Sequence, residues 1–223
     1  MGLDMYLERF PRCRDCTPEE IYRVNELLAY EQNEDAKKKY SLEEWAGIEP
    51  DKVPSKELVE QLRPYFQTRF YYWDDEHRYP TNCVYEHVGY WRKANEIHDW
   101  FVQNVQDGID DCNYHSEVTK ELLERLRDTC LKILRNTTLV PGKIKNGYRY
   151  ENGKEIPIEI DGLIVEDPTE CERYLPTSSG FFFGSTSYDE YYIYDLKKTV
   201  QICDEVLEST DFETQMIFYC SSW

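Results

Sequence analysis

The chain lacks the features that would place it in a membrane or on a secretory route. No apolar run approaches the roughly 18 residues that a membrane-spanning helix needs. The start, MGLDMYLERF, does not combine basic residues with a following apolar stretch, so no signal peptide is predicted. We therefore expect a cytoplasmic protein that makes no contact with membranes.

Basic residues are also few. The chain has 26 Lys and Arg against 44 Asp and Glu, and its formal net charge is -18. Because no dense Lys/Arg run interrupts this surplus, we expect no direct binding to DNA. Two interpretations of the acidic surface stay open. It keeps the protein soluble, or it imitates nucleic acid and occupies the groove of a basic protein.

Patterns that ligate metals are scarce. Of eight cysteines, only Cys13 and Cys16 form a C-x-x-C, and no second ligand pair follows at the spacing that zinc needs. The four histidines form no close pair. We therefore predict no metal and no cofactor, and we expect most thiols to be reduced and packed in the core.

Aromatic residues, by contrast, are abundant: they make up 15% of 223 residues and include 19 Tyr. Hydrophobic periodicity predicts a single, mainly helical α+β domain. Its small mixed or antiparallel sheet is expected to combine the N-terminal strand 2–10, the Gly-bounded strand 179–185, the C-terminal strand and a 143–165 hairpin, a segment in which Asn-Gly occurs twice.

Capping patterns predict where helices start. Thr17 forms a capping box with Glu20, and Ser41 begins a second, short helix. Ser116 is predicted to cap a later helix, Ser187 would cap another if residues 176–192 form a plain strand-turn-helix, and QDGIDD is predicted to be an acidic turn. The residues expected in the core are Ala94, Ile97, Phe101, Leu122, Leu126, Phe182 and Val200.

The segment GYWRKANEIHDWF, residues 89–101, is the first candidate site. It is predicted to belong to a helix from about Val88 to Val105. At 100° per residue, an apolar stripe has Trp91, Asn95 and His98 along one border, with Lys93 and Trp100 along the other. Ligand pockets form where an aromatic wall meets a few polar groups. The alternative is that Trp91 packs in the core and His98 is structural.

The second candidate is PTSSGFFFGSTSYDEYY, residues 176–192. A strand, a turn containing Ser185, Thr186 and Ser187, and a helix start would together present free N–H groups to an anion. The segment lacks the Lys of a P-loop and is not a G-x-S-x-G elbow. Phe183 and Asp189 complete this set. The alternative is a plain strand-turn-helix. No nucleophile is paired with a base, so no catalytic residue is assigned.

Three blocks, MGLDMYL, VGYWRKANEIHDWFVQNVQDGIDDC and LPTSSGFFFGSTSYDEYY, resemble a family of small conserved hypothetical proteins of bacteriophages, prophages and Firmicute-type bacteria. Relative to shorter members, residues 11–82 look like a helical insertion and residues 137–174 like a hairpin insertion. The resemblance implies a phage setting, hence a host cytoplasm, and no particular reaction. It also favours a role for the polar residues of these blocks.

Two functions from different classes stay open. In the first, a phage-type counter-defence protein sequesters a host immune signal by binding a small nucleotide-like ligand. Trp91 or Trp100 would stack on its ring, Asn95 and His98 would bond its edge, and Arg92 or Lys93 with residues 185–187 would meet phosphate. In the second, the acidic surface blocks a basic host defence nuclease by contact. A third interpretation is an enzyme that modifies the same ligand. Whether the chain forms an oligomer is left open.

Overall fold

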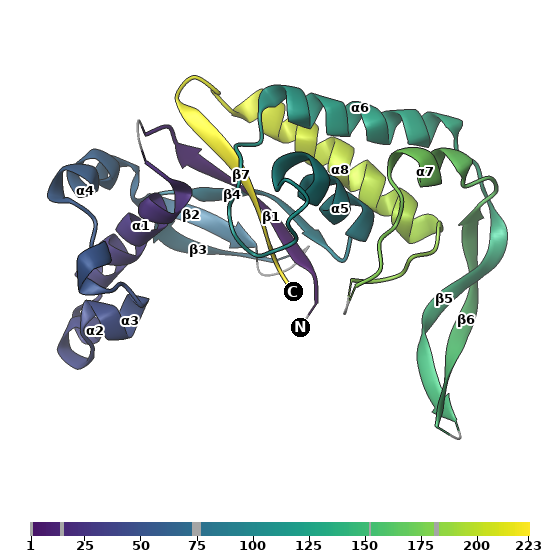
Figure 1. The fold of residues 1–223 in the computed structure, drawn as a ribbon, viewed down its shortest axis with the longest axis horizontal. Coiled ribbons are helices and arrows are strands. Elements are labelled where there is room, and N and C mark those ends of the chain that lie inside the picture. Colours follow the sequence, from purple (N-terminus) through teal and green to yellow (C-terminus); the bar gives the residue numbers. More distant parts are fainter. Residues whose placement is uncertain (1, 14–15, 73–76, 152, 181–182) are drawn as a thin grey trace.

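The two ends of the chain meet in a three-stranded antiparallel sheet, in which β1 (Asp4–Pro11) lies between β4 (Glu86–Arg92) and β7 (Gln215–Ser222) (Figure 1). Alternation along DMYLERFP sends Met5 and Leu7 to one face and Glu8 and Phe10 to the other. The computed structural model describes residues 2–13, 16–72, 77–151, 153–180 and 183–223.

Helices account for most of the remaining mass, and two further strand pairs form separate hairpins. The helices are α1 Pro18–Gln32, α2 Glu34–Lys39, α3 Leu42–Ala46, η1 Pro50–Lys52, α4 Lys56–Leu62, η2 Arg63–Tyr65, α5 Asn95–Val105, α6 Lys120–Asn136, α7 Thr169–Tyr174 and α8 Glu190–Ser209. The hairpin strands are β2 Gln67–Tyr72, β3 Arg78–Cys83, β5 Leu139–Glu151 and β6 Lys154–Val165. The predicted α+β class is confirmed.

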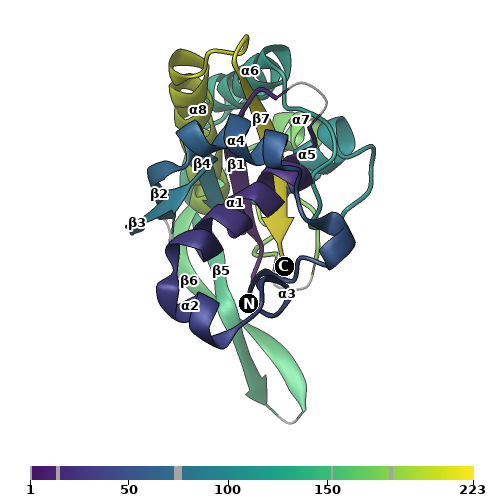
Figure 2. The ribbon, with the colours of Figure 1, turned by 90° about the vertical axis from the view of Figure 1, so that its left-hand side faces the viewer.

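Each face of the sheet packs against its own set of helices. Met5 and Leu7 join α5, α6 and α8 in the larger core, and Figure 1 shows these three helices on one side of the strands. Phe10 and Phe218 join α1 and α4 in a smaller core on the other face. In Figure 2, α1 crosses in front of the sheet. The loop after α5 reaches this second face, where Tyr114 packs edge-on against Phe10.

The predicted hairpin is present, but it is not part of the central sheet. β5 and β6 pair only with each other and extend away from the helices as a twisted ribbon (Figure 1). One isolated bridge, Ile164 to Asp189, joins the base of this ribbon to the start of α8. The prediction that this hairpin belongs to the same sheet as the N-terminal and C-terminal strands was therefore wrong.

The helix predicted from Val88 to Val105 is in fact a strand followed by a shorter helix. Tyr90 and Trp91 lie in β4, paired with Tyr6 and Met5 of β1. Lys93 has a φ of 62°, and this left-handed residue separates the strand from α5. Pairing with a strand more than 80 residues earlier overrides the helical spacing, which is a purely local signal.

The predicted strand 179–185 is also absent from the part of this segment that the structure describes. Its described residues, 179–180 and 183–185, form a loop without strand pairing. Phe183 is buried, but it packs edge-on against His98 with ring centroids 5.2 Å apart. A short apolar run between glycines indicates burial and does not by itself specify a sheet. Phe182 lies outside the described residues.

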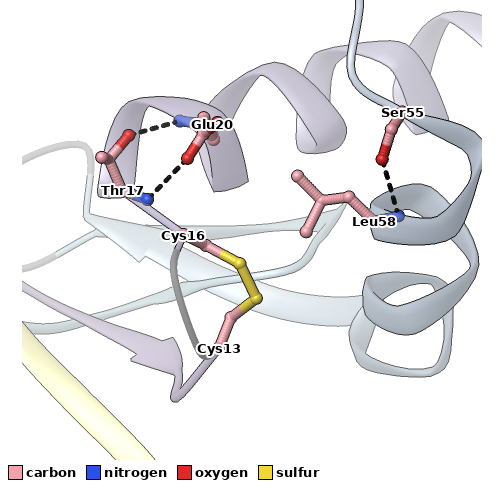
Figure 3. The surroundings of a disulfide bond; sticks show 6 residues. All are labelled: Cys13, Cys16, Thr17, Glu20, Ser55 and Leu58. Carbon is pink, nitrogen blue, oxygen red and sulfur yellow. Dashed lines mark hydrogen bonds between the residues drawn. A yellow bond between two sulfur atoms is a disulfide. The ribbon is translucent and has the colours of Figure 1, made fainter.

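Two of the four predicted caps are confirmed. The Thr17–Glu20 capping box is present (Figure 3), and Ser41 caps α3. The other two helices start later than expected. Backbone bonding of residue 118 to β7 keeps the chain extended beyond Ser116, so Thr119 caps α6. The bridge to β6 likewise makes Asp189, not Ser187, the cap of α8.

Most of the predicted core is confirmed. Ala94, Ile97, Phe101 and Leu126 are buried, whereas Leu122 and Val200 are partly buried and pack against the same cluster.

Cys13 and Cys16 form a disulfide just before α1 (Figure 3), whereas reduced thiols were expected for this C-x-x-C. Four of the other cysteines are buried free thiols. Among the described helices, none is both long and apolar enough to span a membrane.

Candidate functional site

Asn95 ties the start of α5 to the loop 176–186. Its Nδ2 donates to the carbonyl oxygens of Phe183, at 3.2 Å, and Ser185, at 2.8 Å. Its Oδ1 accepts from the backbone N–H of Ser178 at 2.8 Å. The predicted proximity of this helix to the 183–190 turn is therefore real, but the amide is fully buried and occupied by backbone groups.

His98 sits between two other side chains. Its Nδ1 lies 2.7 Å from the hydroxyl of Tyr219 and its Nε2 lies 3.0 Å from Oδ1 of Asp110. Burial lowers the pKa of His98, and Asp110 opposes that shift. Both ring nitrogens thus have protein partners, which is the arrangement expected of a structural histidine.

The two tryptophans of the segment are core residues. Trp91 is completely buried, and its Nε1 donates to the hydroxyl of Thr199 at 2.9 Å. Trp100 is nearly buried beneath the guanidinium of Arg125. Neither indole offers an open face on which a ligand ring could stack.

The remaining predicted residues divide between surface and cap. Arg92, Lys93, Ser185, Thr186 and Ser187 are exposed. Asp189 is buried instead, because its Oδ1 caps α8 by accepting from the N–H groups of residues 191 and 192. The structure therefore brings Asn95, His98, Phe183 and Ser185 together and orients Arg92 elsewhere. Ligand binding by this set stays a prediction.

A more open site lies on the other face of the sheet. A cavity of about 350 Å³ opens between α1, the segment after α3 and the loop after α5. This volume is within the range of roughly 300–1,000 Å³ typical of small-ligand sites. Its lining residues are Glu19, Tyr22, Arg23, Glu26, Ala46, Gly47, Ile48, Lys52, Cys112, Asn113 and Tyr114.

Two aromatic rings and two cations share this cavity. Tyr22 is 42% exposed, and Tyr114 reaches in from the loop after α5. Lys52 pairs with Glu49 at 2.8 Å. Arg23 makes no hydrogen bond or ion pair with any residue that the structure describes. In a chain of net charge -18, an arginine without a carboxylate partner among the described residues is an available anion ligand.

The loop that supplies Tyr114 is held by its own side chains. Oδ1 of Asp111 lies 2.8 Å from Nε2 of His115 and accepts from the N–H of Asn113 at 2.9 Å. These contacts, His115 first, lower the pKa of Asp111 to about 2. The loop therefore presents Cys112, an exposed free thiol, in a defined conformation at the edge of the cavity.

A buried carboxylate lies beneath Tyr114. The Tyr114 hydroxyl donates to Oε2 of Glu8, and Oε1 of Glu8 lies 2.9 Å from Nε2 of His87. Burial, and then Glu8, raise the pKa of Tyr114, so the phenol stays protonated and donates. One rim residue of the cavity is thus anchored to the centre of the sheet.

The sequence patterns do not predict this cavity. Tyr22, Arg23 and Lys52 lie on helical segments whose spacing predicts only burial or exposure. Cys112 and Tyr114 fall next to a stretch predicted to be an acidic turn. A cysteine and an aromatic residue inside a polar loop were the one available signal, because loops on a rigid scaffold often carry binding residues.

No protein-family model, curated protein or solved structure matches this chain.

Proposed function

We propose that the protein binds a small nucleotide-like ligand in the cavity between α1 and the loop after α5. One observation carries the proposal: Tyr22 and Tyr114 line the same cavity as Arg23 and Lys52. Tyrosine rings stack on flat heterocycles, and guanidinium and ammonium groups bind phosphate. A ligand that joins an aromatic ring to a phosphate uses both kinds of group at once.

The acidic residues of the cavity favour a ring with amino groups. Glu19 and Glu26 lie on the same wall as Arg23, one turn of α1 before and after it. Carboxylates accept hydrogen bonds from exocyclic amines and repel additional phosphates. The arrangement therefore suits a ligand of low negative charge, such as a mononucleotide, better than a triphosphate.

The biological role in the proposal comes from the resemblance to phage proteins. A phage-encoded protein that holds a nucleotide without transforming it would act in counter-defence by sequestering a host immune signal. No chemical step is proposed, because binding and release of the ligand suffice for this role.

Two experiments test the proposal. Mass spectrometry of small molecules released from the purified, denatured protein should detect a nucleotide-like compound. Ligand-free protein is then titrated with AMP, GMP, CMP and UMP. Arg23→Gln should weaken the best of these by roughly 5- to 150-fold, which corresponds to about 1–3 kcal/mol for a lost charged hydrogen bond. Arg135→Gln, on the exposed end of α6, is the matched control and should bind normally.

The alternative function predicts a different pattern. If the protein inhibits a basic nuclease by contact, no nucleotide is released or bound, and the protein forms a complex whose affinity falls steeply with salt. That pattern, or equal affinities in Arg23→Gln and Arg135→Gln, would contradict the proposal.

A further inference from the structure

A second cavity, of about 310 Å³, lies between β2, β4 and the end of α8. It shares no lining residue with the first cavity. Its lining residues are Arg9, Thr68, Arg69, Phe70, Glu86, His87, Val88, Glu205 and Ser209. Arg9 and Arg69 also line a smaller adjoining cavity of about 100 Å³. The guanidinium groups of Arg9 and Arg69 therefore lie between two adjoining cavities.

Both guanidiniums converge on one carboxylate. Arg9 donates through Nη2 to Oε1 of Glu86, and Arg69 donates through Nη1 to Oε2 at 2.8 Å. The two cations are close enough to affect one another: burial first, and then Arg69, lower the pKa of Arg9. Placing like charges together is unfavourable unless a counter-charge lies between them. Glu86 supplies one negative charge against two positive charges.

Hydrogen-bond donors outnumber acceptors at this site. Arg69 bonds only to Glu86 among the described residues, and its Nε is buried without a partner. Arg9 also reaches Ser209 and Thr210 through Nη1, but its Nε is likewise buried and unpaired. Buried polar groups normally have partners. Both Nε–H groups are closed to solvent, so an anion in the cavity would meet the outer nitrogens of the guanidiniums. The side chains of Arg9 and Arg69 are 14% and 23% exposed, and Arg69 uses only Nη1 for Glu86, so donors remain available to an acceptor from outside the chain.

The other carboxylate of the cavity does not supply that acceptor. Glu205 is exposed on α8, and its Oε1 accepts from Gln201 at 2.7 Å. It forms no ion pair with Arg9 or Arg69 in the described structure. Its position limits the negative charge that the cavity tolerates and favours a compact anion.

We propose that this second cavity binds a compact tetrahedral oxyanion, inorganic phosphate or a phosphate monoester, between Arg9 and Arg69. The planar guanidinium fork matches two oxygens of such an anion, and two forks can hold one anion from two sides. In this arrangement Glu86 competes with the anion for the same donors. The site is independent of the function proposed for the first cavity.

Calorimetric titration with sodium phosphate at constant ionic strength tests this inference, with chloride as the control anion. Arg69→Gln should weaken phosphate binding by at least about tenfold. Glu86→Gln removes the competitor and should strengthen binding, whereas a purely structural ion-pair cluster would not respond in this way. Arg127→Gln disrupts exposed pairs with Asp128 and Asp204 and should leave phosphate affinity unchanged. Arg23→Gln should also leave it unchanged.

A measurement on the wild-type protein tests the proposal even if the variants fail to fold. The arginine Nε–H resonances of Arg9 and Arg69 should shift during a phosphate titration, while that of Arg127 should not. Glycerol phosphate in place of inorganic phosphate tests whether a monoester fits as well. Phosphate binding no tighter than chloride, unshifted Arg9 and Arg69 resonances, or unchanged affinity in Arg69→Gln would each overturn the proposal.

Discussion

Oε1 of Glu8 lies 2.9 Å from Nε2 of His87, and both side chains are almost completely buried. The second carboxylate oxygen accepts from Tyr114. Tyr71 packs over the imidazole, with ring centroids 4.0 Å apart. Because Tyr114 lines the first cavity and His87 lines the second, this buried acid connects the walls of the two proposed sites through the sheet.

Glu8→Ala should destabilise the fold by about 1–3 kcal/mol for each of the two buried groups, the Tyr114 hydroxyl and the His87 imidazole, that lose their partner. Glu8→Gln keeps a group that can bond to both neighbours and should cost less. Glu117→Ala is the matched control, since it removes a partly exposed partner of Arg12 and should cost about 0–1 kcal/mol. Urea unfolding measures all three. Equal losses for Glu8→Ala and Glu117→Ala would show that the Glu8 contacts do not stabilise the sheet.

Glu96 should make stability fall as pH rises. It is only 3% exposed, its Oε1 has no partner, and burial, then Asp195, raise its pKa well above the usual 4.5. The folded protein therefore keeps a proton that the unfolded chain has lost. The contribution of Glu96 to stability is fully present below the pKa that its carboxyl has in the unfolded chain. Above that pKa the free energy of unfolding declines by about 1.4 kcal/mol per pH unit, until Glu96 ionises in the folded protein.

Glu96→Gln tests this expectation, because glutamine carries no charge at any pH. The groups around Glu96 are Asp189, Asp195, Tyr192 and Cys130, and burial also raises the pKa of Asp189. Urea unfolding at pH 5 and pH 8 should show a flatter profile in Glu96→Gln than in the wild type. Glu121→Gln, on the exposed start of α6, should keep the wild-type slope. Parallel slopes in all three proteins would rule out a proton on Glu96.

Asn95→Ala should release the loop 176–186. The substitution removes bonds to the carbonyls of Phe183 and Ser185 and to the N–H of Ser178, and a cost of about 1–3 kcal/mol is expected for the groups left unpaired. Amide hydrogen exchange should accelerate at Ser178 more than elsewhere. Asn136→Ala, at the exposed end of α6, should leave this exchange unchanged. Unchanged protection at Ser178 in Asn95→Ala would mean that other contacts hold the loop.

Local chemistry made part of the fold predictable. The capping box at Thr17 and the β5–β6 hairpin depend on neighbours close in sequence, and both are present, although the Asn-Gly at 146–147 lies at an irregularity within β5 and makes no hairpin turn. β4 was predicted to be helical because its identity as a strand depends on pairing with β1, which local spacing does not encode. The break at Lys93 could not be predicted either, because a left-handed backbone conformation is usually indicated by glycine and lysine stands at this position.

The candidate site was harder to predict for the same reason. Tyr22, Lys52 and Tyr114 come from three segments that only the folded chain brings together. The polar residues of GYWRKANEIHDWF do make specific contacts, but the contacts of Asn95 and His98 are with backbone and side-chain groups within the core. Polar residues in an aromatic segment can bind a ligand or another part of the chain, and spacing does not separate these cases.

The most direct test of the central claim is the alkylation rate of Cys112. This thiol is the exposed one among the free cysteines, and it lines the first cavity. Iodoacetamide labelling followed by peptide mass spectrometry should show that Cys112 reacts fastest in the native protein. The best-binding mononucleotide at ten times its Kd should slow this reaction about tenfold, because only the free protein reacts. In Arg23→Gln the same concentration should protect little. Tight nucleotide binding with an unchanged Cys112 rate would place the ligand elsewhere and contradict the account.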